Sequence, residues 1–264
     1  MDPSTPPGLT EFQARESLIE HALAMNALGI NHGKAGNLSL RWDRSHRPQG
    51  AGFLITPSAV AYQRLKADDI VWVSLQADPD RSVPGSEAAR RDLPVFDGER
   101  KASSEWRMHR DLLRARPELG AVVHTHSRHA AALSCLAKVQ KEGIPAFHYM
   151  IALSGQSRIS CAAYASFGTQ ALSDAMLAAL PEGAKACLLA HHGLIAAGED
   201  LPTALALAEE IEALAAMYAL TLQLGGPAIL DAAAMDTVHK AFVDYRSGLD
   251  RQDNEAAGLN GPDR

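Results

Sequence analysis

The sequence predicts an α/β protein in which a single sheet is covered by helices on both faces. Short apolar runs bounded by turn residues interleave with longer segments whose apolar residues recur at helical spacing. The chain has 264 residues, of which 47% are hydrophobic, so it can bury one substantial core. We expect one domain over residues 1–247 and a polar, disordered C-terminal tail over residues 248–264.

The N-terminal part is predicted to contain one helix and three strands. Residues 11–28 carry apolar side chains at helical spacing, with Thr10 as a suitable N-cap and Gly29 at the end. Three apolar runs follow, in NHGKAGNLSLRW, GFLITPSAV and DIVWVSL. We interpret them as three strands that form an antiparallel start to the sheet. Residues 76–102 are rich in charge, Pro and Gly, so we expect a long surface excursion without an assigned role.

In the C-terminal part, helices and strands are predicted to alternate. From Ser103 the pattern becomes helical, with Ser103 and Ser104 to cap the helix and Pro117 to end it. The strand GAVVHTH follows, and then a helix over residues 127–138. The remaining elements are a helix in SFGTQALSDAMLAAL, a strand in ACLLAHHGLIAAG and a long helix in LPTALALAEEIEALAAMYALTLQLGG.

Composition argues against nucleic-acid and membrane partners. The formal net charge is −6 and no run of Lys and Arg forms a basic stripe. No segment reaches the roughly 20 apolar residues that span a bilayer, and the N-terminus does not resemble a signal peptide. Cys135, Cys161 and Cys187 stand far apart, which favours reduced thiols in a cytoplasmic protein.

The stretch VVHTHSRHAA, residues 122–131, places His124 and His126 two apart at the end of an apolar run. Residues i and i+2 of a strand share a face, so the two imidazoles could chelate a metal. The alternative is two partly buried histidines with ordinary hydrogen-bond partners. The run LLAHHGLIA supplies a third candidate, because His191 and His192 would face opposite sides and one could join the pair. Three imidazoles with an open position are typical of catalytic zinc.

Chemistry at such a metal needs a base, and Glu105 in KASSEW is the candidate. On spacing alone, the pattern favours the other interpretation, in which a Glu behind Ser103 and Ser104 stabilises the helix start by capping. The hydroxyls and free N–H groups of this helix start also suit a phosphate. The loops HGKAGNLS and TPSA are further candidates for an anion cradle, or are simply turns.

Seven blocks follow one another in order within residues 12–247, namely GNLSLR, ITPSA, SSEW, RPELGAVVHTHSRHA, IPAFHYMIALSG, AAYASFGT and LLAHHGLIAAG. Together they resemble the class II aldolase/adducin family, and within it the L-fuculose-1-phosphate aldolase branch. The resemblance implies a three-layer αβα fold around a predominantly antiparallel sheet. It also implies a cyclic homotetramer with active sites between neighbouring subunits.

The resemblance assigns the metal and the acid to particular residues. His124, His126 and His192, the second histidine of HHG, would bind one Zn²⁺ per subunit, and another divalent transition metal is possible. Glu105 would deprotonate and reprotonate the substrate. His129 and His191 would then be supporting or packing residues.

The resemblance also implies residues that contact the substrate. The phosphate pocket would be formed by Gly36, Asn37, Thr56, Ser58, Ser103 and Ser104. Tyr149 matches a tyrosine that donates a proton to the aldehyde oxygen from a neighbouring subunit, and Tyr245 aligns more weakly with a second tyrosine.

The implied reaction is the reversible cleavage of a ketose 1-phosphate to dihydroxyacetone phosphate and an aldehyde, through an enediolate held on the metal. The candidate substrates are L-fuculose 1-phosphate, 5-deoxyribulose 1-phosphate and methylthioribulose 1-phosphate. Two departures from the family pattern leave the ketose open. Lys34 replaces a small hydroxyl residue two before the Gly–Asn pair, and Ala59 replaces a Gly after TPS.

Related functions remain as alternatives. Ribulose-phosphate 4-epimerases share VHTHSRHA, but they have Asp at the position of Glu105 and lack HYMIA. A decarboxylase would use the same metal to hold an enolate, and Lys34 could serve its carboxylate. A non-catalytic adducin-type module would lose the metal-binding histidines, which this chain retains.

Overall fold

An eight-stranded sheet forms the centre of the molecule. The computed structural model describes residues 9–44, 50–76 and 96–256, with side chains to residue 245. The strand order is β4-β3-β2-β1-β5-β10-β9-β8, and all neighbours are antiparallel except β8 and β9. The predicted antiparallel sheet is therefore confirmed. Its strands are β1 (Asn37–Arg41), β2 (Gly52–Ile55), β3 (Val71–Ser74), β4 (Phe96–Asp97), β5 (Ala121–Thr125), β8 (Cys161–Ala162), β9 (Ala186–Leu189) and β10 (Gly193–Gly198).

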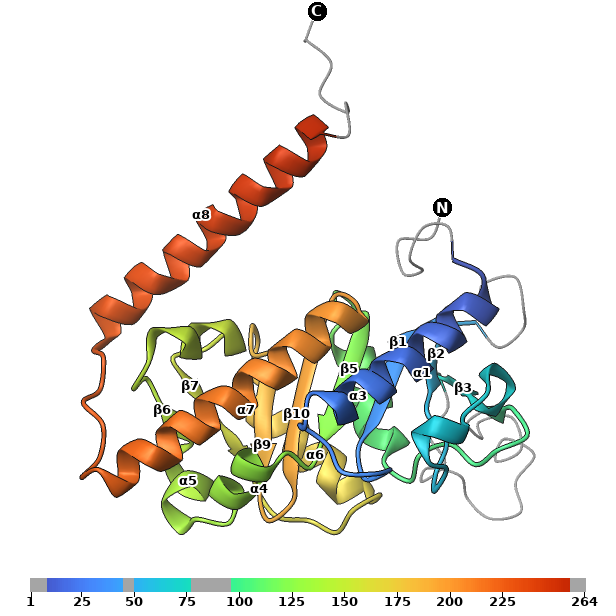
Figure 1. Cartoon of the computed structure of the whole chain (residues 1–264), viewed down its shortest axis with the longest axis horizontal. Coiled ribbons are helices and arrows are strands. Elements are labelled where there is room, and N and C mark those ends of the chain that lie inside the picture. The colour runs from blue at the N-terminus through green and yellow to red at the C-terminus, as the bar shows by residue number, and fades with distance from the viewer. Residues whose placement is uncertain (1–8, 45–49, 77–95, 257–264) are drawn as a thin grey trace, which may run out of the picture.

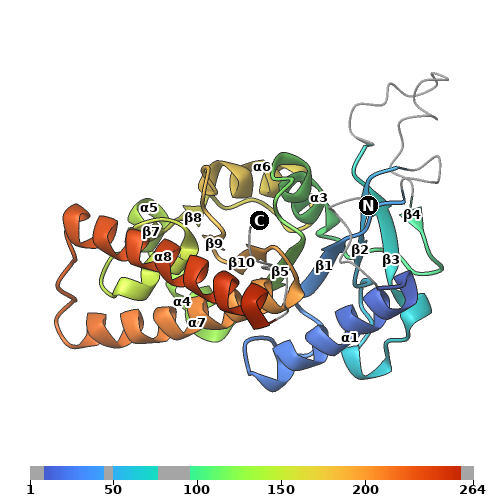
Figure 2. The ribbon, with the colours of Figure 1, turned by 90° about the horizontal axis from the view of Figure 1, so that it is seen from above.

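Helices cover both faces of this sheet, as predicted. Figure 2 shows α3 and α6 on one side and α1 and α7 on the other. A two-stranded pair of β6 (Ile144–Pro145) and β7 (Arg158–Ile159) lies apart from the main sheet. The helices are α1 (Glu11–Ala27), α3 (Trp106–Ala115), α4 (Arg128–Ser134), α5 (Ala137–Glu142), α6 (Gln170–Ala179), α7 (Leu201–Gln223) and α8 (Ala232–Ala256), with the 3₁₀ segments η1 (Tyr62–Arg64), η2 (Ala67–Asp69) and η4 (Tyr149–Ser154).

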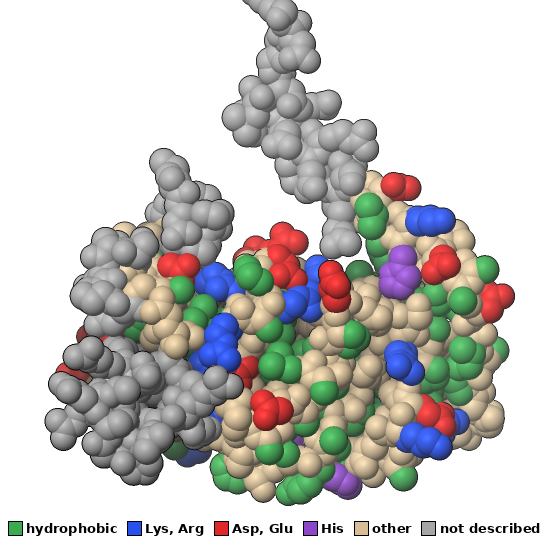
Figure 3. Space-filling view, turned by 180° about the vertical axis from the view of Figure 1, so that it is seen from behind, with side chains coloured by type: hydrophobic (Ala, Val, Ile, Leu, Met, Phe, Trp, Pro, Cys, Tyr) green, Lys and Arg blue, Asp and Glu red, His purple; other side chains and the backbone are tan. Residues whose placement is uncertain are grey.

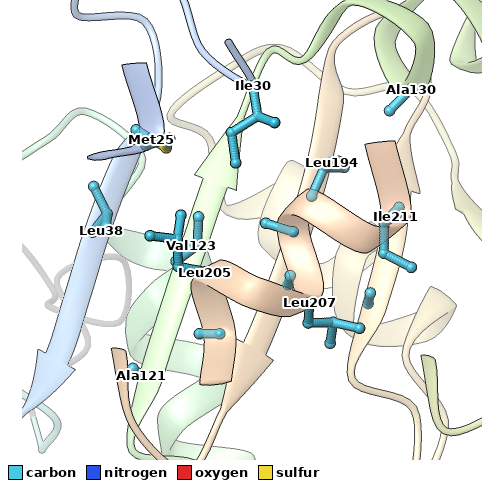
Figure 4. Packing of buried hydrophobic residues seen from close by; sticks show 14 of the residues in the cluster. Met25, Ile30, Leu38, Ala121, Val123, Ala130, Leu194, Leu205, Leu207 and Ile211 are labelled. Carbon is cyan, nitrogen blue, oxygen red and sulfur yellow. The ribbon is translucent and has the colours of Figure 1, made fainter. Parts of the chain in front are cut away.

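The strand register determines which side chains of β1 and β5 lie on each face of the sheet. Leu38 of β1 pairs with Val123 of β5, and both lie in the larger apolar cluster. Figure 4 shows them with Leu194 against the residues of α7. Asn37 pairs with His124 one position along, and successive strand residues alternate between faces. These polar side chains therefore point to the opposite face, toward α3.

Helix α1 forms where the sequence predicts it. Thr10 accepts a hydrogen bond from the backbone N–H of Gln13, and the Gln13 side chain accepts one from the Thr10 N–H. This capping box satisfies two backbone donors that the first turn would otherwise leave unpaired. Leu18 and Met25 are fully buried on the face turned to the sheet.

The run ACLLAHHGLIAAG differs from the prediction. It is two antiparallel strands, β9 and β10, joined by a tight turn. His191 adopts the left-handed conformation, with φ +56°, and so reverses the chain. His191 and His192 therefore lie in a turn and not on opposite faces of one strand.

Three further boundaries differ from the predictions. The segment predicted as one helix over residues 127–138 is divided into α4 and α5 at Cys135 and Leu136. Most of the excursion over residues 76–102 lies outside the described residues, but Phe96 and Asp97 form β4 and pair with β3. Helix α3 begins at Trp106, with Glu105 as its N-cap.

Helix α8 extends beyond the compact body (Figure 1). Its first part contacts η4, and Met235 is buried against the larger apolar cluster. The helix runs through residue 248, where the sequence places the domain boundary, and its backbone is helical to Ala256. The division into a domain and a tail stays a prediction, and residues 257–264 lie outside the described part of the chain.

Two surface properties bear on partners. Among the described helices, none combines the length and the apolar character needed to cross a membrane. On the face seen in Figure 3, acidic and basic side chains are interspersed among apolar ones.

Candidate metal centre

Four side chains from separate parts of the chain meet on the α3 side of the sheet. Glu105 is the N-cap of α3, His124 is in β5, His126 lies one residue past β5, and His192 lies in the β9–β10 turn. Each offers one ligand atom, and these atoms all lie within 4.8 Å of one another. Glu105 and His124 are buried, while His126 and His192 are half-buried.

The turn that carries His192 is fixed by close packing. The backbone N–H of His191 donates to the Ser134 carbonyl, and that of His192 lies within hydrogen-bond distance of the Ser134 hydroxyl. A Cβ at Gly193 would lie 2.2 Å from the Thr125 carbonyl oxygen, which is too close for any side chain. Glycine therefore lets β10 approach β5 and brings His192 to the level of His124.

The spacing of the four side chains suits a metal ion. His124 Nε2 lies 3.1 Å from Glu105 Oε2 and 3.1 Å from His126 Nε2, and His192 Nε2 lies 3.2 Å from Glu105 Oε1. Ligand atoms at the corners of a tetrahedron around zinc would be about 3.3 Å apart. His124 Nδ1 donates to the Leu194 carbonyl at 2.9 Å, which turns the lone pair of Nε2 into the cluster. The residues present therefore fit a divalent metal.

Among the three histidines, the surroundings favour the charged form of His124 and the neutral forms of His126 and His192. Burial lowers the pKa of His126 and of His192 to about 4, with His124 adding to the effect. Burial also lowers the pKa of His124, but Glu105 and the Leu194 carbonyl outweigh it and raise the pKa overall. For Glu105, burial raises the pKa, yet His124, His192 and Asn37 hold it well below its usual range. Without a metal, the centre thus favours a protonated His124 facing the ionised Glu105, and a bound metal ion would take the place of that proton.

Glu105 occupies the N-cap position of α3, but its side chain does not cap the helix. Its side chain makes no capping hydrogen bond, and it faces the histidines instead. The Ser103 hydroxyl accepts from the Glu105 backbone N–H at 3.3 Å. The serine-capped start that the sequence suggests is therefore replaced by a local turn in which Ser103 orients the residue before α3.

A pocket of about 290 Å³ opens onto the centre. Its walls include Tyr164 and Phe167 beside Glu105, His126 and His192. Both are strongly exposed and lie in the loop between β8 and α6, so no burial pattern marks them in the sequence. His191 also lines the pocket, with its ring edge-on to Tyr164.

The six predicted phosphate residues are divided between two places. Ser58, Ser103 and Ser104 line a second pocket of about 630 Å³, together with the basic residues Arg100, Lys101 and Arg107. This pocket shares Ser104 and Phe167 with the first.

The other three predicted phosphate residues, Gly36, Asn37 and Thr56, contact residues of the pockets or of the metal cluster. The Asn37 amide contacts Glu105, the Thr56 carbonyl accepts from the Ser103 N–H, and a Cβ at Gly36 would lie 2.4 Å from the His124 carbonyl oxygen.

The two departures from the family pattern lie against each other. Lys34 Nζ donates to the Ala59 carbonyl at 3.1 Å, so its ammonium lies over the loop that carries Ser58. Ala59 has φ +64°, a conformation that favours glycine. The chain therefore keeps the backbone shape of a glycine turn without the glycine.

The two tyrosines that the family resemblance assigns to the reaction, Tyr149 and Tyr245, lie outside both pockets. Tyr149 is in η4, half exposed, and stacks on Phe242 of α8 with ring centroids 6.3 Å apart. It does not line either pocket within one chain, and Tyr245 is exposed on α8. His129 is bound through Nδ1 to Glu212 of α7 at 2.8 Å, which is a packing contact outside the cluster.

Three imidazoles and a carboxylate beside a pocket rich in hydroxyls and cations define a metal-dependent enzyme of the αβα class. Residues 16–219 match the family described as Class II Aldolase and Adducin N-terminal domain. The chain therefore belongs to the class II aldolase and adducin family, and it is a lyase of the aldolase kind.

Individual proteins similar to this chain are named as aldolases. A 5-methylthioribulose-1-phosphate/5-deoxyribulose-1-phosphate aldolase of Rhodospirillum rubrum is 44% identical over 231 residues, which cover 88% of this chain and 91% of that protein. An L-fuculose phosphate aldolase of Escherichia coli is 40% identical over 210 residues, which cover 80% and 84%. A solved L-fuculose 1-phosphate aldolase superimposes with a TM-score of 0.72 at 31% identity, covering 87% of this chain and 96% of its own.

Proposed function

We propose that this protein is a zinc-dependent aldolase that cleaves a ketose 1-phosphate to dihydroxyacetone phosphate and an aldehyde. The observation that carries the proposal is the convergence of Glu105 with three imidazoles beside the serine-lined pocket. The substrate class is that of the Rhodospirillum rubrum relative, a 5-methylthioribulose or 5-deoxyribulose 1-phosphate, with L-fuculose 1-phosphate as the second candidate.

His124, His126 and His192 would hold the metal through their Nε2 atoms. A divalent metal held there supplies Lewis-acid stabilisation for the negative charge that appears when the C3–C4 bond breaks. In cleavage, the protonated form of Glu105 would give a proton to C3 to complete dihydroxyacetone phosphate, and in the condensation direction the ionised carboxylate would remove that proton. Its ionised state and its contact with Asn37 suit the second task.

The phosphate would lie in the larger pocket. Ser58, Ser103 and Ser104 supply hydroxyls, and Arg100, Lys101 and Arg107 give the pocket a positive lining. Lys34 adds a further positive charge over the Ser58 loop.

The aldehyde end of the substrate would meet Tyr164 and Phe167. Both line the pocket that opens onto the metal centre. Exposed aromatic side chains suit a small apolar group such as a methyl or methylthio end. This environment supports a deoxy or methylthio ketose over a fully hydroxylated one.

We also propose a homotetramer in which Tyr149 of a neighbouring copy protonates the aldehyde oxygen in the condensation direction. The exposure of Tyr149 and its absence from the pocket walls of its own chain support this arrangement. A cytoplasmic location fits the three free thiols, Cys135, Cys161 and Cys187.

The test is release of dihydroxyacetone phosphate from a panel of ketose 1-phosphates, followed by coupled reduction. The panel contains the 5-methylthio and 5-deoxy ribulose phosphates, L-fuculose 1-phosphate and ribulose 1-phosphate. We expect turnover to be highest for the first two. Absence of release from every member would refute the aldolase proposal and favour the decarboxylase or epimerase, which assays for carbon dioxide and for C4 inversion would then separate.

A further inference from the structure

A buried histidine extends the metal centre away from solvent. His109 is fully buried and lies one helical turn after Glu105, on the same side of α3. Its Nε2 lies 2.5 Å from Asn37 Oδ1, and its Nδ1 lies 2.8 Å from Ser39 Oγ. Asn37 and Ser39 are two apart in β1 and so share the face turned to α3. The four side chains therefore connect α3 to the sheet directly behind the reactive carboxylate.

The chemistry of the groups fixes the direction of these hydrogen bonds. Asn37 Nδ2 donates to Glu105 Oε2 at 3.0 Å, because an ionised carboxylate only accepts. Asn37 Oδ1 then faces His109 and is also an acceptor, so His109 Nε2 must carry the proton. His109 Nδ1 is left to accept from the Ser39 hydroxyl in the neutral ring.

The surroundings favour that neutral ring. His109 has no exposed surface, and burial, followed by the charge of His124, lowers the pKa of His109 to about 3. One tautomer, with its proton on Nε2, therefore satisfies every partner that surrounds the ring.

We propose that His109 is a positioning residue for the reaction: it holds the Asn37 amide in the orientation that presents Nδ2 to Glu105 and so fixes the carboxylate. This inference rests on the proposed role of Glu105 as the group that transfers the proton. Without the His109 donor, the amide is free to turn its oxygen toward the carboxylate, where two acceptors repel each other. Loss of a group that orients a reacting side chain typically costs about 10–100-fold in activity.

The test compares His109→Leu, which removes the donor, with His109→Gln, whose amide N–H can reach Asn37 Oδ1. We expect His109→Leu to lower kcat about 10–100-fold with little change in KM, and His109→Gln to recover most of that loss. In a Glu105→Gln background, adding His109→Leu should lower kcat no further, because there is no longer a proton-transferring carboxylate to position. Equal effects in both backgrounds, or equal loss in both His109 variants, would overturn the inference.

A readout that does not depend on turnover separates this inference from the proposed function. In the cobalt-loaded protein, the visible absorption reports the surroundings of a metal held by the three imidazoles, and Glu105 lies in contact with two of these imidazoles. We expect His109→Leu to change this spectrum at unchanged cobalt content and His109→Gln to restore it. If the wild type cleaves no ketose phosphate but shows this pattern, the positioning role stands and the proposed reaction falls. An unaltered spectrum together with unaltered kcat in His109→Leu would sink the positioning role alone. Should that variant not fold, His109→Phe, which keeps an aromatic ring at this buried position but has no donor, takes its place in the same comparison.

Discussion

Glu105 combines burial with ionisation. Only 5% of its surface is exposed, which by itself disfavours a charged carboxylate, yet two histidines and the Asn37 amide keep its pKa low. One of its oxygens faces His192 and the other faces His124. A carboxylate held in this way stays ionised and fixed in orientation inside a mostly dry site.

Glu105→Gln keeps the shape of the side chain and removes its ability to carry a proton. We expect kcat to fall by about 10²–10⁴, with metal still bound by the three imidazoles. The control is Glu118→Gln, which alters an exposed carboxylate paired with Arg116 and should leave kcat unchanged. Steady-state kinetics and metal analysis of both variants provide the check, and an active Glu105→Gln enzyme would argue against proton transfer by this residue.

Ala59 has a strained backbone in the loop that carries Ser58, a residue of the proposed phosphate pocket. Because its φ of +64° suits glycine, Ala59→Gly should raise the free energy of unfolding by about 0.5–1 kcal/mol. Gly33→Ala is the matched reverse change, since Gly33 has φ +63° and open space around its Cβ position, and it should lower that free energy by about as much. Urea unfolding measures both. A destabilised Ala59→Gly variant would show that the loop does not carry the expected strain.

At the scale of elements, the sequence predicts what local patterning controls. Helix α1 follows from its cap and its apolar spacing, and the strands β1, β2 and β3 follow from short apolar runs between turns. The β9–β10 turn differs from the continuous strand that the sequence predicts, because apolar residues on both sides of the turn hide the chain reversal. That reversal depends on the backbone of His191 and on contacts with the distant Ser134.

The candidate site also contains some features that local sequence patterns predict and others that depend on contacts between distant residues. Spacing alone indicates the pair His124 and His126 but leaves open which histidine of HHG joins them, and the family resemblance assigns His192. The hydrogen bonds from His109 through Asn37 to Glu105 join residues about 70 positions apart, and only tertiary packing brings them together. Two spacings in the sequence could have suggested these hydrogen bonds. Asn37 and Ser39 are two apart in β1, and Glu105 and His109 are four apart at the start of α3.

Gly193→Ala tests the close approach of β10 to β5. The added Cβ would collide with the Thr125 carbonyl, so the strands must separate and carry His192 away from His124. We expect stability to fall by about 3 kcal/mol or more, and zinc to bind more weakly. Gly225→Ala is the control, since nothing lies within 4 Å of its Cβ position, although its positive φ will cost some stability. Zinc affinity measured by competition with a chelator should drop only in Gly193→Ala, and unchanged affinity there would contradict the account.

At the scale of the whole molecule, the metal centre joins the parts of the fold. Its four side chains come from the start of α3, the end of β5 and the β9–β10 turn. A metal bound there would link a helix of one outer layer to two regions of the sheet. The pocket beside it is open, and the exposed Tyr149 and the projecting α8 lie on surfaces available to another copy of the chain.

Metal removal should therefore affect stability and activity together. At a free zinc concentration 100 times the dissociation constant, binding stabilises the folded state by about 2.7 kcal/mol. We expect a chelator to lower the thermal unfolding midpoint and to abolish cleavage, and added zinc to restore both. Thermal unfolding of the His126→Ala variant, which lacks one ligand, should respond far less to the same treatment.

The most direct test is to titrate the metal-free protein with zinc while measuring release of dihydroxyacetone phosphate from 5-methylthioribulose 1-phosphate. The account predicts that activity rises in proportion to bound zinc and levels off at about one equivalent per chain, the number that one three-histidine site holds. Full activity in the metal-free protein, or a fully loaded protein that releases no dihydroxyacetone phosphate, would contradict it.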